Sequence, residues 1–154
     1  MHQEDAESIY LLNLDPEVIK YTCDLPFESV EKAKDFIENY NHYKLYGFGR
    51  WAVIGKSDNE FLGWCGLKYT AELNEYDIGF RFFKKYWNQG FATEAAIKCL
   101  EIGFKEFKMK EIVGRAMKGN IASIKVLEKI GMKYSHDFDY EGNVNAKYIL
   151  ENQK

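Results

Sequence analysis

Between residues 77 and 83, Ile78, Phe80 and Phe82 alternate with Gly79, Arg81 and Phe83, which is a period of two. This spacing is typical of a β-strand with two different faces. A few residues later the apolar positions follow helical spacing instead: Ala92, Ala95, Ala96, Cys99, Leu100, Gly103, Phe104 and Phe107. The pattern predicts a strand over 77–83 and a helix over about 89–107, with the change between them at 88–90.

The rest of the chain shows the same two kinds of spacing in alternation. Helical spacing occurs over 6–14, over a short piece from 16 to about 21, over 29–43 and over 120–130. Runs rich in β-favouring residues, bounded by turn residues, occur over 50–54, 61–69, 110–117, 133–140 and 144–150. We predict an α/β (α+β) fold in which helices cover both faces of a mixed, mostly antiparallel sheet.

Composition places the chain among ordinary folded domains. Its 154 residues are expected to form one domain, residues 1–154, with 46% hydrophobic and 29% charged residues. No apolar run approaches the length of a membrane span and the start has no signal-peptide pattern, so we expect a cytoplasmic protein without a membrane partner. The formal charge of −3 argues against broad nucleic-acid binding, and neither the three cysteines nor the three histidines have metal-ligand spacing. We therefore expect no nucleic-acid partner and no metal.

The loop at residues 88–90 is the first candidate for chemistry. A loop that leads into a helix carries N–H groups without intrahelical acceptors, beside the positive end of the helix dipole. Such a helix start binds anions. Gly90 would let the main chain approach a ligand closely, because glycine has no Cβ. The alternative is that Gly90 only makes a tight turn between the strand and the helix.

Two separated sequence blocks resemble one family. The first is residues 87–95, WNQGFATEA, preceded by strand residues 78–80, and the second is residues 120–132, NIASIKVLEKIGM. In this order they resemble the GNAT superfamily of acyl-CoA-dependent N-acetyltransferases. Within it, the chain is most similar to the branch that includes the ribosomal-protein N-terminal acetyltransferases. The resemblance extends over nearly the whole chain.

Two features depart from the usual pattern of this family. Relatives usually begin with a strand before the first helix, and residues 1–4 are too short to supply one. Either the chain is shortened, or the sheet starts with what is normally its second strand. Trp87 stands three residues before the loop glycine, where many relatives have Gln or Arg, although this branch commonly has Trp. Trp87 is either a core residue under the loop or a cofactor contact.

The resemblance implies acetyl-CoA as the co-substrate. By carry-over, its pyrophosphate would be held by the loop and first-turn residues Asn88, Gln89, Gly90, Phe91, Ala92 and Thr93. Lys85 would add a positive charge beside them. In the resembled family the pantetheine arm pairs with the central strand like an added strand, which makes Phe82 and Phe83 its backbone partners here.

The second block contains two further candidates. Asn120 follows a predicted strand and starts a helix, so by itself it is an N-cap, while in relatives the matching Asn also bonds the pantetheine amides. Ser123 lies in the first turn of that helix, and the resemblance also makes it a cofactor contact whose hydroxyl faces the CoA sulfur. The resemblance makes Ser123 the candidate proton donor to the departing thiolate, whereas taken alone its hydroxyl is equally well a capping or solvated group.

A general base is harder to identify. Glu75 and Asp77 lie at the start of the central strand, where some relatives place a carboxylate, and they are our candidates. The alternative is that they are solvated charges. An α-amine with a pKa of about 8 is roughly one-fifth neutral near pH 7.4, whereas a lysine amine with a pKa of about 10.4 is only about one-thousandth neutral. The lack of a clearly identified base therefore fits an α-amine, or another amine of low pKa, better than a lysine.

These observations predict an acetyl-CoA-dependent N-acetyltransferase that acts by direct attack in a ternary complex. The expected partner is an amine acceptor, either a protein N-terminus or a small-molecule amine. Tyr43, Tyr46 and Phe48 are candidates for the acceptor side. An antibiotic or polyamine acetyltransferase remains an alternative, although such enzymes ordinarily have a more acidic acceptor cleft. A non-catalytic acyl-CoA sensor and a homodimer also stay open.

Overall fold

The computed structural model of the chain describes residues 1–153. Its strands are β1 (Arg50–Ile54), β2 (Phe61–Thr70), β3 (Glu75–Phe82), β4 (Glu111–Met117), β5 (Lys133–Tyr140) and β6 (Asn143–Glu151). Its α-helices are α1 (Ala6–Leu14), α2 (Pro16–Ile19), α3 (Val30–Asn39), α4 (His42–Tyr46), α5 (Phe91–Lys105) and α6 (Ile121–Lys129). Two short 3-10 helices are η1 (Gln3–Asp5) and η2 (Lys84–Tyr86).

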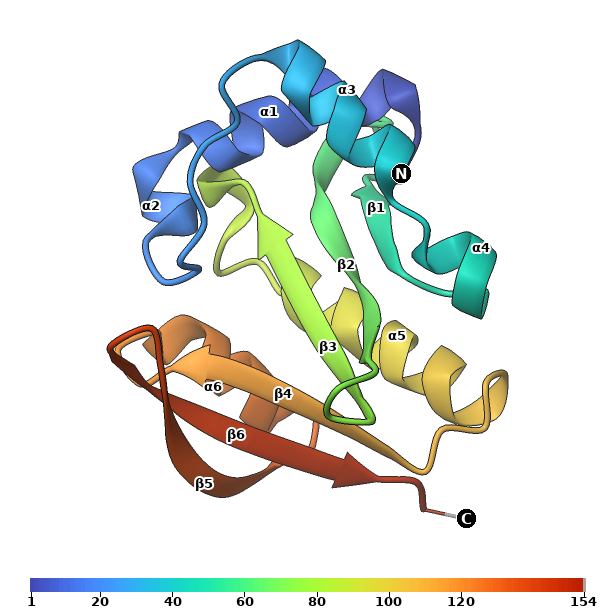
Figure 1. Cartoon of the computed structure of the whole chain (residues 1–154), viewed down its shortest axis with the longest axis vertical. Helices are drawn as coiled ribbons and strands as arrows, with labels where there is room; N and C mark the ends of the chain where they lie inside the picture. The colour runs from blue at the N-terminus through green and yellow to red at the C-terminus, as the bar shows by residue number, and fades with distance from the viewer. Residues whose placement is uncertain (154) are drawn as a thin grey trace.

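The strands of residues 1–153 form a six-stranded sheet in the order β1-β2-β3-β4-β6-β5 (Figure 1). β3 and β4 run parallel, and every other neighbouring pair is antiparallel. The predicted mixed, mostly antiparallel sheet is therefore confirmed. Because β3 and β4 are parallel, the chain crosses over between them, and α5 forms this crossover.

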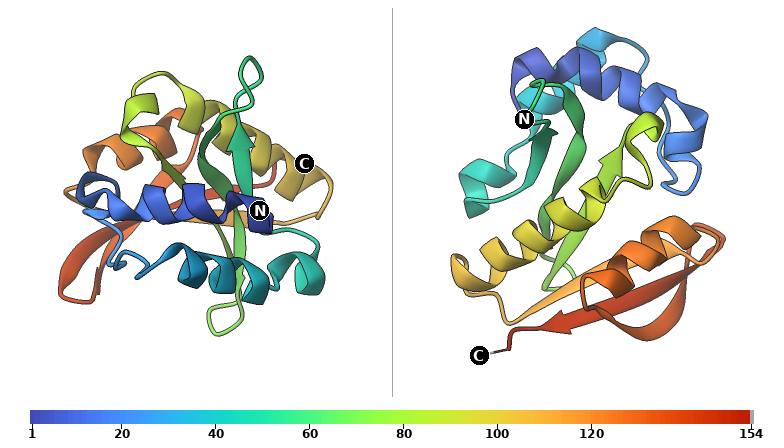
Figure 2. Two further views of the ribbon diagram at one scale, coloured as in Figure 1. Left: turned by 90° about the horizontal axis from the view of Figure 1, so that it is seen from above. Right: turned by 180° about the vertical axis from the view of Figure 1, so that it is seen from behind.

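Helices cover both faces of the sheet, as Figure 2 shows. On one face, α5 and α6 bury an apolar core that includes Leu67 of β2, Ile78 of β3 and Ile112 of β4. On the other face, α1 and α3 form a smaller core around Ile9 and Ala33, against which Phe61 and Trp64 of β2 pack. The two faces of β3 therefore have different neighbours, as its period of two predicts.

Two predicted helices are shorter than their apolar spacing indicates. The helix expected from 16 to about 21 ends at Ile19. The helix expected over 29–43 ends at Asn39, because Tyr40 has an extended backbone (φ −77°, ψ 109°), and α4 begins separately at His42. Apolar spacing alone does not show such a break, because the spacing continues through it.

The sheet begins with β1, which pairs on one side with β2 and forms one edge. Within the described residues no strand precedes α1, and the chain before β1 is helical or irregular. The sheet of the described residues therefore starts at Arg50, which agrees with either of the two alternatives raised by the sequence.

Candidate functional site

β3 and β4 separate soon after they begin to pair. In the described chain their register contains two residue pairs, Asp77 with Val113 and Ile78 with Gly114. β3 then continues to Phe82 and β4 to Met117 without pairing to each other, and Figure 1 shows the two arrows diverging. Main-chain groups of β3 that face β4 beyond Ile78 are therefore left without a strand partner. Such groups need another hydrogen-bonding partner when water is excluded.

The hydrogen-bonding phase of β3 decides which residues face this divergence. The Phe83 N–H donates to the Leu62 carbonyl at 3.0 Å, so the Phe83 amide points toward β2. Main-chain groups alternate from residue to residue along an antiparallel pair, so those of Phe80 and Phe82 point away from β2, toward β4. The expectation that Phe83 offers its amide to the cofactor is therefore wrong. The main-chain groups of Phe80, which the sequence pattern did not single out, point toward the open edge instead.

Trp87 holds the end of β3 rather than filling the core. Its side chain is 38% exposed, and its indole N–H donates to the Phe82 carbonyl at 2.9 Å. The interpretation of Trp87 as a core residue is therefore wrong. Because the Phe82 carbonyl is already bonded, the groups left on the open edge are the Phe82 N–H and both main-chain groups of Phe80.

The loop before α5 brings the predicted amides together at an open surface. Gly90 is the N-cap with a φ of 85°, and Asn88 has a φ of 61°. The first backbone hydrogen bond within the helix is donated by the Glu94 N–H to the Gly90 carbonyl, at 3.0 Å. The N–H groups of residues 91–93 thus have no intrahelical acceptor. No side chain within residues 1–153 caps this helix, and no described atom lies within 4 Å of where a Cβ on Gly90 would stand.

The side chains around this loop leave one lysine free. The Gln89 side chain donates to the Lys85 carbonyl at 2.8 Å and so fixes the loop. Lys84 lies 3.6 Å from Glu17. Lys85 is exposed, lies over the ring of Tyr86 at 5.1 Å, and has no carboxylate partner among residues 1–153. Lys85 therefore stays the candidate for the positive charge predicted beside the amides.

The start of α6 carries the second pair of candidates. Asn120 Oδ1 accepts from the Ser123 N–H at 3.2 Å, which confirms Asn120 as the N-cap. Both residues are half-buried. Within the described chain the Ser123 hydroxyl and the Asn120 side-chain N–H₂ group have no hydrogen-bond partner. These groups are free to bind a ligand.

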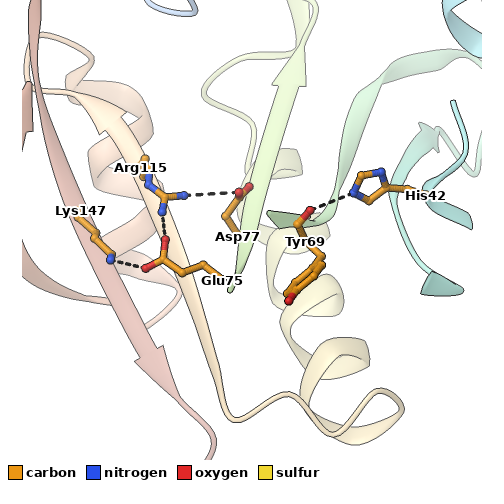
Figure 3. A network of polar contacts seen from close by, with 6 residues as sticks. All are labelled: His42, Tyr69, Glu75, Asp77, Arg115 and Lys147. Atoms are coloured by element: carbon orange, nitrogen blue, oxygen red, sulfur yellow. Dashed lines mark hydrogen bonds and ion pairs between the residues drawn. The ribbon is translucent and has the colours of Figure 1, made fainter. Parts of the chain in front are cut away.

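The predicted carboxylates lie in an ion-pair network on the sheet (Figure 3). Arg115 of β4 donates to Glu75 and lies 3.5 Å from Asp77, and Lys147 of β6 also donates to Glu75. The side chains of Glu75 and Asp77 are only 17% and 15% exposed. They are therefore not solvated loop charges.

Asp77 and Glu75 differ as proton acceptors. Burial raises the pKa of the Asp77 carboxyl, and Arg50 and Arg115 offset this only in part. Burial also acts on Glu75, but the hydrogen bond from Lys147 and the charge of Arg115 hold the pKa of Glu75 below its ordinary value. A carboxylate bound by two cations is a poor base. Asp77 is the better candidate of the two.

The three aromatic residues predicted for the acceptor side do not form one exposed surface. Phe48 is 4% exposed and belongs to the main core, so its assignment to an acceptor surface is wrong. Tyr46 stacks on Phe48. The Tyr43 hydroxyl donates to the carbonyl of Arg50 and accepts from the amino group of Met1 at 3.0 Å. Tyr43 therefore holds β1 in place.

The comparisons with known proteins identify the family. Residues 1–133 match the acetyltransferase (GNAT) domain. The chain belongs to the GNAT family of acetyltransferases. It is 35% identical to the uncharacterized protein YkkB of Bacillus subtilis (strain 168), over 88% of this chain and 80% of that protein. It is 33% identical to the uncharacterized N-acetyltransferase p20 of Bacillus licheniformis, over 86% of this GNAT chain and 76% of the relative.

Solved structures of GNAT proteins have the same fold. An acetyltransferase (GNAT family) from Bacillus anthracis has a TM-score of 0.85 at 29% identity, covering 100% of this chain and 93% of that one. Spermidine N-acetyltransferase from Vibrio cholerae, in complex with CoA and spermine, has a TM-score of 0.83 at 16% identity over 100% and 94%. Ribosomal-protein-S5-alanine acetyltransferase from Vibrio fischeri has a TM-score of 0.82 at 16% identity over 99% and 91%. The last two show the fold alone.

The residues present fit the co-substrate of this GNAT family, acetyl-CoA. The uncapped amides of residues 91–93 and Lys85 suit a pyrophosphate, and the open edge of β3 suits an arm that contains amide groups. The chain is thus an acetyl-CoA-dependent N-acetyltransferase. Between residues 1 and 153, no helix has the length and hydropathy of a membrane span, and no cluster of three His, Cys, Asp or Glu side chains could hold a metal ion.

Proposed function

We propose that this enzyme transfers the acetyl group of acetyl-CoA directly to a primary amine, either the α-amine of a protein N-terminus or the amine of a small molecule. The observation that carries the proposal is the open edge of β3 beyond Ile78, which leads into the uncapped start of α5. Both features serve one ligand, because the strand ends where the loop to the helix begins. The two sequence blocks also support placing the enzyme in the branch that includes the ribosomal-protein N-terminal acetyltransferases.

Each residue in the site has a distinct role in this proposal. When bound, acetyl-CoA supplies a thioester whose carbonyl carbon is attacked by the neutral amine. The Phe80 N–H, which points toward β4, donates to the carbonyl oxygen as negative charge develops there. The Ser123 hydroxyl gives a proton to the departing sulfur, and Asp77 accepts the proton that the new amide nitrogen loses.

The role of Asp77 is tested by the pH dependence of kcat/KM. Asp77→Asn should lower kcat/KM by about 100-fold at pH values above the pKa of Asp77. Since that pKa is raised by burial, the two enzymes should converge as the pH falls through it, because protonated Asp77 can no longer accept a proton. Glu75→Gln is the matched comparison and should show no such convergence. A constant ratio between wild type and Asp77→Asn at every pH would exclude Asp77 as the base.

The proposed function is tested first by binding and then by turnover. Acetyl-CoA at about 100 times its Kd should stabilise the protein by about 2.7 kcal/mol, which corresponds to roughly 5–10 °C in melting temperature. Release of free CoA with a panel of peptides and small amines then measures transfer, and a gain of one acetyl group in the mass of the acceptor locates it. Stabilisation without transfer to any amine would favour the non-catalytic sensor.

A further inference from the structure

The chain contains three arginines, and all three lie on the face of the sheet opposite α5 and α6. Arg50 of β1 is opposite Gly66 of β2, which is opposite Gly79 of β3. Arg81 follows Gly79 by two residues on β3, and Arg115 of β4 reaches Asp77 on the same face. Since paired residues and residues two apart share a face, the three side chains are neighbours.

Two of these arginines have their charge matched by partners within the protein. The Arg81 guanidinium, 12% exposed, donates to Asn13 at 2.8 Å and to Asp24 at 2.7 Å. Arg115 donates to Glu75 and lies 3.5 Å from Asp77. Each is thus part of a structural ion pair.

The Arg50 guanidinium makes no such ion pair with the described residues, although burial raises the pKa of the nearby Asp77 carboxyl and the Arg50 charge offsets part of that rise. It lies over the ring of Trp64, with the guanidinium carbon 4.6 Å from the ring centroid, and Arg50 is half-buried. Within residues 1–153 it makes no ion pair and donates no side-chain hydrogen bond. Its main chain is fixed, because its N–H donates to the Tyr40 hydroxyl at 2.9 Å and its carbonyl accepts from the Tyr43 hydroxyl. A guanidinium held on an aromatic face with free donors is preorganised for an oxyanion.

The Arg50 side chain ends beside Gly79 of β3, next to the point where β3 and β4 separate. One guanidinium nitrogen of Arg50 lies 3.3 Å from where a Cβ on Gly79 would stand. Gly79 follows Ile78, the last residue of β3 that pairs with β4, and precedes Phe80. Since one strand residue spans about 3.3 Å, the free donors of Arg50 are close to the edge where transfer is proposed. Because Gly79 has no side chain, the Arg50 guanidinium can lie against β3 at this position.

We propose that the acceptor is a small amine that carries an oxyanion, in the simplest case the carboxylate of an amino acid, and that Arg50 binds this oxyanion. This proposal rests on the proposed function and deepens it. The carboxylates of this face, Glu75 and Asp77, already face Arg115, and Glu75 also binds Lys147. The site as described therefore offers one excess cation and does not match a polycationic acceptor such as a polyamine.

A panel of matched amines tests the substrate class by CoA release. Each amino acid is compared with its own carboxamide, phosphoethanolamine with ethanolamine, and spermidine is included. Each kcat/KM is divided by the fraction of the substrate amine that is neutral at the assay pH, which removes the effect of differences in amine pKa. We expect kcat/KM to be about 10- to 100-fold higher for the carboxylate than for the carboxamide, the value of a charged hydrogen bond. A preference for phosphoethanolamine alone would identify the oxyanion as a phosphate. A preference for spermidine would overturn the proposal.

Variants assign the preference to one residue. Arg50→Gln should lower kcat/KM for the carboxylate substrate about 10- to 100-fold more than for the carboxamide, so that the preference disappears. The loss of the Arg50 charge near Asp77 acts equally on both substrates, and the ratio between their kcat/KM values removes it. Lys44→Gln is the control, because it removes an exposed positive charge from the neighbouring helix α4. An equal loss with Lys44→Gln, or an equal loss for both members of the substrate pair, would contradict a specific role for Arg50.

A binding measurement needs no turnover. N-acetylamino acids and their carboxamides, tested singly with saturating CoA, are compared for their effect on melting temperature. We expect the carboxylates to stabilise the wild-type complex further and to have no effect on the Arg50→Gln complex. If CoA stabilises both proteins but no carboxylate or phosphate adds to it, the oxyanion proposal fails and the proposed function stands. If CoA does not stabilise the wild type, the proposed function itself fails.

Discussion

The helices α5 and α6 follow two neighbouring parallel strands, yet their first turns are built differently. Asn120 caps α6 by accepting from the Ser123 N–H, so the helix satisfies one of its own free amides. α5 starts at Gly90 with a positive φ, and no side chain in residues 1–153 caps it. A capped start is complete without a ligand, whereas uncapped amides need water or an anion. The comparison supports the proposal that α5 would bind the cofactor with its main chain and α6 with its side chains.

The largest effect should come from blocking the α5 start. Gly90→Val puts a β-branched residue at a φ of 85° and a side chain into the open space before the amides. We expect a loss of at least about 100-fold in affinity for CoA, because several charge-assisted hydrogen bonds are lost together. Isothermal titration measures it.

Gly131→Val is the matched control for this strain. Gly131 follows α6, has a φ of 95°, and also has no described atom within 4 Å of its Cβ position. Each substitution should cost about 1–3 kcal/mol of stability from the left-handed backbone. Equal losses of CoA affinity in the two variants would show that strain, and not the amide site, explains the Gly90 result.

The next effect should come from the side chain that α6 offers. Ser123→Ala should lower kcat by about 100-fold while the stabilisation by acetyl-CoA stays unchanged, since the hydroxyl acts in transfer and not in binding. Steady-state kinetics and melting curves with acetyl-CoA measure the two quantities. Unchanged turnover would remove Ser123 as the proton donor.

A smaller effect is expected from the cap of α6. Asn120→Ala should lower the free energy of unfolding by about 1 kcal/mol, or roughly 2–4 °C in melting temperature, because the Ser123 N–H loses its acceptor. If Asn120 also bonds the pantetheine arm, the affinity for CoA should fall several-fold as well.

The smallest effect on the cofactor is expected from a cap elsewhere. Ser29 caps α3 by accepting from the Lys32 N–H at 3.2 Å, on the other side of the sheet from α5 and α6. Ser29→Ala should therefore cost about 1 kcal/mol of stability and leave CoA affinity unchanged. A similar fall in CoA affinity for Ser29→Ala and Asn120→Ala would mean that both act only through stability.

Much of the fold could be predicted because its signals are local. The alternation around Ile78, the helical spacing after Ala92 and the turn residues of the hairpins each lie within a few residues of sequence. The loop at Gly90 and the cap at Asn120 were predicted for the same reason. The break after Asn39 was not, because the apolar spacing runs through Tyr40 even though its backbone is extended.

The sequence by itself determined most of the elements, the family and the position of the loop that is proposed to bind phosphate. Only the tertiary structure decided that Phe80 and not Phe83 has its amide on the open edge, because this depends on which pairs of β2 and β3 exchange hydrogen bonds. It also decided that Glu75 is bound by Arg115 and Lys147, whereas the Arg50 guanidinium lies over the ring of Trp64 and contacts no carboxylate of the described chain in an ion pair. These neighbours lie on other strands, far away along the chain. The sequence gives the charge of each side chain, but only the fold decides which opposite charges lie close enough to neutralise it.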